Sequence, residues 1–178
     1  PIVHFRRVED CIDLPEKQEI EIDLGLDDDK LLRDADIERP EAYMSVVERL
    51  SKAKTPHMIS WVEDFLGSNQ EQLLVFALNT HPIKALREKF PKEVRLITGA
   101  ESQAERSQNL KDFQEGKYRV LAMSYACGAE SLNLQNCRYA LYHGFPWNDA
   151  KRRQAMARIW RQGQKEKTFH YFLMSGEN

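Results

Sequence analysis

The second half of the sequence alternates short apolar runs with amphipathic stretches, and this alternation restricts the chain to one class of fold. Residues 73–78 form a continuous apolar run, Leu-Leu-Val-Phe-Ala-Leu, of the kind found in strands covered on both faces. Strands that alternate with helices form parallel sheets with helices on both sides. We therefore expect an α/β fold with a central parallel sheet flanked by helices. Further strands are predicted at 94–97, 118–123, 139–142 and 168–174, and helices near 81–90, 102–116 and 148–161. The second of these helices is expected to begin with a capping box, Ser102-Gln-Ala-Glu105.

The first 70 residues carry weaker patterns. Residues 18–24 alternate polar and apolar side chains, which predicts a half-buried strand, and the acidic stretch 27–36 predicts a loop or a weak helix. One helix is then predicted from Pro40 to about Leu50, and a second from Thr55-Pro56 to Gly67. These features divide the chain into a linker with the first strand (1–24), a short helical insertion (25–70) and the main domain (71–178).

Composition excludes several classes of protein. The chain has 42% hydrophobic and 30% charged residues, as a soluble globular domain does, and no apolar run reaches the roughly 18 residues of a membrane span. Cys11, Cys127 and Cys137 show no CxxC spacing, so we expect buried thiols in a cytoplasmic protein, with neither disulfides nor a zinc site. The net charge is −2, but residues 151–167 carry seven basic side chains and one acidic one. Such a stretch either attracts a polyanion or forms a solvated helix face.

Unusual sequence patches coincide with the places where a parallel sheet binds ligands. In open α/β sheets, ligands bind beyond the carboxyl ends of the strands. Residues 79–81 and 124–134 fall there, as does the loop that leads into the helix predicted from Asn148. This coincidence indicates a functional site rather than a fold alone.

Three polar residues of that helix have a spacing that suits phosphate chemistry. Gln154, Arg158 and Arg161 are spaced i, i+4 and i+7, which puts them on one face of the predicted helix. Two guanidiniums on one face repel each other unless an anion meets them, and their planar forks match phosphate oxygens. The alternative is an amphipathic surface helix whose arginines pair with aspartate or glutamate.

Several motifs, in the same order along the chain, resemble those of SNF2-type superfamily-2 helicases. Residues 154–164, Gln-Ala-Met-Ala-Arg-Ile-Trp-Arg-Gln-Gly-Gln, match motif VI (QAxxRxxRxGQ) at every fixed position. Residues 124–135 resemble motif V, and 74–77 resemble the strand of motif IV. Phe5-Arg-Arg7 followed by Leu14-Pro-Glu-Lys17 is similar to the "RR…LPxK" link between the two motor domains of that family. These motif sequences are most similar to those of phage and prophage members of the family.

This resemblance implies a second RecA-like motor domain of three layers over residues 71–178. Arg161 would be an arginine finger that reaches across a cleft to ATP, Arg158 would reach the same nucleotide, and Gln154 would help to orient its γ-phosphate. ATP and Mg²⁺ would be held mainly by a first RecA-like domain, and the partner would be double-stranded DNA bound without sequence preference. Contacts to the nucleic-acid backbone are implied for Ser124, Gly128, Asn133, Asn79, Thr80 and His81. For Lys151, Arg152 and Arg153, non-specific attraction to DNA and a solvated face are equal alternatives.

Departures from the family pattern limit these expectations. Ala129 and Ser131 stand where motif V usually has glycine, a residue that lets the backbone approach a phosphate. The sequence contains neither GxxxxGK[ST] nor Asp-Glu-x-His, so we expect this polypeptide alone to hydrolyse no ATP. It ends at Asn178, before the helical brace expected after the last strand. Two alternatives remain: a non-catalytic RecA-like module that binds nucleic acid or protein, and an RNA helicase, whose motif VI usually ends in arginine where this chain has Gln164.

Overall fold

Strand β2 (Leu73–Ala77) shows why the apolar run predicts a covered sheet. All five of its residues are buried. Leu73, Val75 and Ala77 pack into one core cluster, whereas Leu74 and Phe76 pack into a second one. Because successive side chains of a strand point to opposite faces, the two clusters lie on the two faces of the sheet.

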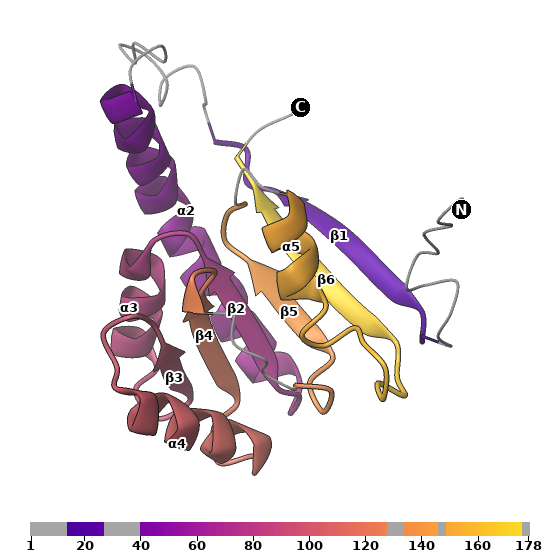
Figure 1. Ribbon diagram of the computed structural model, residues 1–178. Coiled ribbons are helices and arrows are strands. Elements are labelled where there is room, and N and C mark those ends of the chain that lie inside the picture. The colour runs from indigo at the N-terminus through magenta and orange to yellow at the C-terminus, as the bar shows by residue number, and fades with distance from the viewer. Residues whose placement is uncertain (1–13, 27–39, 128–133, 146–148, 176–178) are drawn as a thin grey trace, which may run out of the picture.

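Six parallel strands form this sheet, in the order β1-β6-β5-β2-β4-β3 (Figure 1). The computed structural model describes residues 14–26, 40–127, 134–145 and 149–175. The α/β fold with a central parallel sheet is confirmed, and three strand predictions agree with the structure at both ends. The remaining strands are β1 (Lys17–Asp23), β3 (Val94–Ile97), β4 (Val120–Ser124), β5 (Tyr139–Tyr142) and β6 (Thr168–Met174).

Within the described ranges, two helices cover each face of the sheet. Helices α2 (Pro40–Ser68) and α3 (Thr80–Lys89) pack on the face of Leu73 and Val75, through residues that include Met58 and Ile83. Helices α4 (Gln103–Gln114) and α5 (Asp149–Met156) contribute Phe113, Ala155 and Met156 to the opposite core. The predicted capping box is present at the start of α4, where the Ser102 hydroxyl accepts from the Glu105 amide and the Glu105 carboxylate accepts from Ser102.

The prediction of two helices between residues 40 and 67 is wrong, because α2 is a single helix with Pro56 in its interior. An interior proline lacks the N–H that would bond to the carbonyl four residues earlier, and its ring crowds that carbonyl. The preceding Thr55 hydroxyl donates to the Ser51 carbonyl at 2.7 Å, which satisfies part of the same turn. Val46, Met58 and Val62 are buried on either side of the proline, so burial against the sheet keeps the helix continuous.

The predicted helix 148–161 is also too long, because α5 ends at Met156. Beyond α5 the backbone forms tighter, 3₁₀-type turns. The Arg158 amide donates to the Ala155 carbonyl and the Ile159 amide to the Met156 carbonyl, in each case three residues back. This tightening buries Ile159 fully in the core, and Gly163 then takes a positive φ of 99°. Residues 157–163 are named the arginine turn here, since they carry Arg158 and Arg161. Gln154 and the two arginines therefore do not share a helix face.

Candidate functional site

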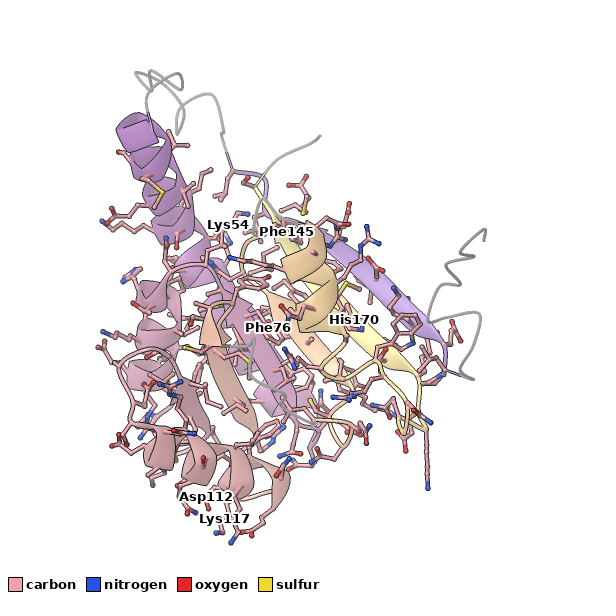
Figure 2. The ribbon with its side chains drawn as sticks, in the orientation of Figure 1. Lys54, Phe76, Asp112, Lys117, Phe145 and His170 are labelled. Atoms are coloured by element: carbon pink, nitrogen blue, oxygen red, sulfur yellow. The ribbon has the colours of Figure 1, made fainter. Side chains whose placement is uncertain are left out.

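Residues that follow β2, β4 and β5 meet at the carboxyl end of the sheet. Ala77 lies opposite Ser124 in the β2–β4 register, so Asn79 and Ser124 reach the same end of the molecule. The backbone N–H of His143, the first residue after β5, donates to the Phe76 carbonyl at 2.9 Å. Figure 2 labels Lys54 at this end and Asp112 and Lys117 at the opposite end.

A cavity of about 580 Å³ opens at this end, between α2 and the start of α3. It brings together all three residues predicted from the end of the motif IV strand. Both exposed large apolar side chains of the described residues, Met44 and Leu78, belong to its wall as well. Its lining consists of Met44, Ser45, Glu48, Ser51, Leu78, Asn79, Thr80 and His81.

The cavity presents hydrogen-bond donors that the protein does not use. Asn79 is the N-cap of α3, but its side chain makes no capping hydrogen bond, so the first-turn amides lack that acceptor. Ser51 is 8% exposed, and its Oγ has no hydrogen-bond partner among the described residues. Glu48, the one carboxylate among the described residues of the wall, is paired with Lys52 at 2.7 Å, a bond that lowers the pKa of Glu48. Free donors at a helix N-terminus suit an anion.

Two buried ionisable groups lie behind the cavity wall. His143 is 2% exposed, and burial lowers its pKa to about 4, with a further lowering by the charge of Lys54 and a raising by a hydrogen bond to the Ser51 backbone. Its Nε2 has no partner within the described part of the chain. Lys54 Nζ donates to the Leu173 carbonyl at 2.8 Å, which fixes α2 to the end of β6. Sequence reasoning missed Ser51, Lys54 and His143.

The depressed pKa of His143 predicts an acid-sensitive contribution to stability. Because its folded pKa of about 4 lies below the ordinary 6.5, the unfolded chain binds a proton between these pH values that the folded chain does not. The unfolding free energy therefore falls as pH drops from 6.5 to 4, by about 3 kcal/mol from this group. Urea unfolding at pH 7 and at pH 4 measures this decrease in the unfolding free energy. Between the two pH values, the unfolding free energy of His143→Gln should fall by about 3 kcal/mol less than that of the wild type.

His57→Gln is the matched control, because His57 is an exposed histidine on α2. The unfolding free energy of this control should depend on pH as that of the wild type does. An unchanged pH dependence in His143→Gln would contradict the buried neutral imidazole.

The two arginines lie at the opposite, amino-terminal end of the sheet. The indole Nε1 of Trp160 donates to the carbonyl of Pro15, just before β1 begins, at 2.8 Å. Arg158 is 6% exposed and its Nε has no hydrogen-bond partner in the part of the chain that the structure describes, whereas Arg161 is exposed. Burial and the nearby charge of Arg161 lower the pKa of Arg158. Neither arginine forms an ion pair with another described residue.

Gln164 fixes the far end of the arginine turn. Its Nε2 donates to the carbonyls of Gln135, Cys137 and Ile159 at 2.9, 3.1 and 3.2 Å. Its Oε1 accepts from the backbone amides of Lys165 and Glu166 at 3.0 and 3.1 Å. The side chain of Gln135 in turn donates to the Gln162 carbonyl and lies over Gly163. Residues 135–137, at the end of the motif V segment, and residues 162–164, at the end of the arginine turn, are thus bonded to each other in both directions.

The remaining predicted residues are placed separately. Gln154 is exposed on α5 and lies beside Tyr125 and Lys151. Arg152 pairs with Glu19 at 3.1 Å, and its guanidinium stacks on Phe145 and Phe172.

Arg153 forms a hydrogen-bonded ion pair with Asp149 on the same helix. Of the three basic residues at the start of α5, only Lys151 has no carboxylate partner in the described part of the chain. The predicted contacts at Gly128 and Asn133 lie outside the described residues, as do 27–36 and Phe5-Arg-Arg7.

Two further features bear on the site. Burial raises the pKa of the Cys137 thiol to about 12, and both Cys127 and Cys137 are buried and unbridged. The described residues contain no cluster of three or more histidine, cysteine or acidic side chains that could hold a metal ion. Within the same residues, no helix is long and apolar enough to cross a membrane.

A protein-family model and several known proteins match the sequence of this chain. The helicase conserved C-terminal domain family matches residues 57–163. The SNF2 domain-containing proteins CLASSY 1 and CLASSY 2 of Arabidopsis thaliana are 31% and 30% identical over 148 and 116 residues. These alignments cover 76% and 60% of this chain, but only 12% and 9% of those proteins. The SWI/SNF-related matrix-associated actin-dependent regulator of chromatin subfamily A-like protein 1 of Bos taurus is 26% identical over 144 residues, 78% of this chain and 15% of that protein.

A solved structure shares the fold. The C-terminal part of the Fun30 ATPase domain superposes with a TM-score of 0.58 at 19% identity, over 65% of this chain and 40% of that one. This match supports the RecA-like character of the sheet. The relatives named here come from a plant and a mammal, and the comparisons give no support to a particular likeness to phage sequences. The chain belongs to the helicase conserved C-terminal domain family and is a C-terminal helicase domain of the SNF2 type.

Proposed function

We propose that this chain is the second motor domain of an ATP-dependent DNA translocase. In this proposal Arg158 and Arg161 act on ATP held by a first motor domain, and the carboxyl end of the sheet contacts the DNA backbone. The chain spans a small fraction of its relatives' length, so the activity belongs to a longer assembly that includes that first domain. ATP supplies the free energy of each step through cleavage of its γ-phosphate bond.

The observation that carries the proposal is the unpaired state of the two arginines. A surface helix would pair them with carboxylates, yet neither has an ion pair with a described residue. Arg158 is also largely buried with its Nε unsatisfied, an arrangement that costs stability. Strained charges of this kind cluster at functional sites, and a triphosphate offers the acceptors that both guanidiniums lack.

The cavity at the start of α3 supports the DNA half of the proposal. Its first-turn amides, which the Asn79 side chain does not cap, can donate to phosphate oxygens, while Lys52 offsets the charge of Glu48. Such contacts read no sequence, because every nucleotide carries the same phosphate. Thr80, the first residue of the helix, is exposed at this point.

A negative charge at Thr80 should weaken DNA binding without weakening the fold. Aspartate in the first turn of a helix is favourable for the helix dipole but repels a phosphate at the same place. We expect Thr80→Asp to lower the affinity for a 20-base-pair duplex about three- to tenfold and to reduce the salt dependence by about one phosphate contact. Fluorescence anisotropy over a series of salt concentrations measures both quantities.

Gln103→Asp is the matched control, since Gln103 is the exposed first residue of α4. It adds the same charge at the same helical position, away from the cavity, and should leave DNA affinity unchanged. Equal affinity of wild type and Thr80→Asp would refute the contact. An intact two-domain protein whose ATPase responds to RNA and not to duplex DNA would favour the RNA helicase alternative instead.

A further inference from the structure

The segment that leads into β1 is bonded to the arginine turn. Besides the hydrogen bond from Trp160 Nε1 to the Pro15 carbonyl, Lys17 places its Nζ 4.3 Å from the centre of the Trp160 ring. Trp160 directly precedes Arg161 and follows Arg158 by two residues. Residues 14–17, Leu-Pro-Glu-Lys, thus contact the residue between the two arginines, although they lie about 145 positions earlier in the chain.

The same segment is fixed to the elements on either side of that turn. The Glu16 carbonyl accepts from the Thr168 amide at 3.0 Å, and its carboxylate pairs with Lys167 at 2.7 Å. Glu19 pairs with both Lys17 and Arg152, at 3.0 and 3.1 Å, and thereby reaches α5. Because these contacts flank the turn, a displacement of the incoming segment must act on α5, on the start of β6 and on the turn itself.

Arg161 depends on fixed neighbours for its position. Its own side chain is exposed and has no partner among the described residues. On one side Gln164 fixes the backbone to segments inside the domain, and on the other side Trp160 fixes it to Pro15. Within the described residues, Trp160 is therefore the member of the arginine turn whose side chain bonds to the incoming segment.

We propose that Trp160 is a positioning residue. Its hydrogen bond to Pro15 and its contact with Lys17 hold Arg158 and Arg161 at a fixed position relative to residues 14–17, the segment that leads into β1. This inference rests on the proposed function, because it assigns the contact a role in aligning Arg158 and Arg161 on ATP. The indole suits this task, since it is a rigid ring with a single donor that a backbone carbonyl satisfies.

Trp160→Phe removes the donor and keeps an aromatic ring under Lys17. In the 178-residue chain, we expect amide hydrogen exchange of residues 157–163 to become about fivefold faster, as the loss of one hydrogen bond allows. Lys17→Met, which removes the charge above the ring, should change exchange in the same direction by a smaller factor. Trp61→Phe is the matched control: Trp61 is also half-buried, but it packs on Phe65 and Tyr171 on the other face of the sheet.

A second readout separates positioning from support of the fold. In a protein that carries both motor domains, Trp160→Phe should lower kcat for ATP hydrolysis about tenfold, with the KM for ATP and the DNA affinity unchanged. Unchanged exchange at residues 157–163 would overturn the contact. Faster exchange with an unchanged kcat would overturn the positioning role. A wild-type protein without ATPase activity would refute the proposed function and with it the catalytic role, whereas the exchange result still decides the contact.

Discussion

Replacing Arg161 with alanine in a protein that carries both motor domains should reduce kcat for ATP hydrolysis by about 10³-fold or more, while the affinity for duplex DNA is retained. An arginine finger stabilises charge that develops on the transferring phosphoryl group, so its loss affects the chemical step. Arg161 is exposed and unpaired, as a residue that reaches out of its own domain must be. Steady-state ATPase assays with saturating duplex, together with anisotropy binding, test both parts of the expectation.

Two variants sharpen this experiment. Arg161→Lys keeps a charge but loses the planar fork, so it should recover only a minor part of the activity. Arg153→Ala is the matched control, because Arg153 is a solvent-exposed arginine on α5 whose partner is Asp149. Parallel loss of ATPase activity and DNA binding in Arg161→Ala would contradict the finger assignment and indicate a general role in folding.

Gln164→Glu should lower the unfolding free energy by about 3–5 kcal/mol. The substitution keeps the shape of the side chain but replaces Nε2, which donates to three carbonyls, with an acceptor oxygen. That oxygen would then face the carbonyl oxygens of Gln135, Cys137 and Ile159 with a negative charge at a position that is 8% exposed. Urea denaturation followed by circular dichroism at pH 7 measures the change.

Gln162→Glu provides the comparison, since Gln162 is an exposed glutamine in the same turn. Gln162→Glu should leave the unfolding free energy nearly unchanged. A Gln164→Glu variant as stable as wild type would show that these hydrogen bonds contribute little. The same geometry bears on the choice between a DNA and an RNA substrate. The side-chain amide of Gln164 forms hydrogen bonds with five backbone groups, so it is not available to contact the nucleic acid.

Local patterns predicted the sheet well, because its signals are local. The strands at 94–97, 139–142 and 168–174 were delimited by apolar runs, and the start of α4 by the capping box at Ser102. The helix predicted at 148–161 was too long, so Gln154, Arg158 and Arg161 do not share a helix face despite their helical spacing. After Met156 the chain forms tighter turns that bury Ile159 in the core, and Gly163 takes a positive φ.

The site was predicted in part. Placing Asn79, Thr80 and His81 at the carboxyl end required only the topology of a parallel sheet. Ser51 and His143 were missed because their role depends on how α2 packs across that end, and no periodicity encodes the distance between two separate elements. The anchoring of Trp160 by Pro15 is likewise a contact between distant parts of the chain.

The contact between Gln135 and Gly163 makes the constraints on these two positions unequal. A Cβ at position 163 would lie 2.8 Å from the amide atoms of Gln135, so a larger residue there requires that amide to leave first. A shorter residue at 135 removes the collision but not the positive φ of 99°, which still favours glycine. In any lineage of this domain, position 135 can therefore change while 163 remains glycine, whereas a change at 163 needs both a rotation of the Gln135 side chain and a new backbone path.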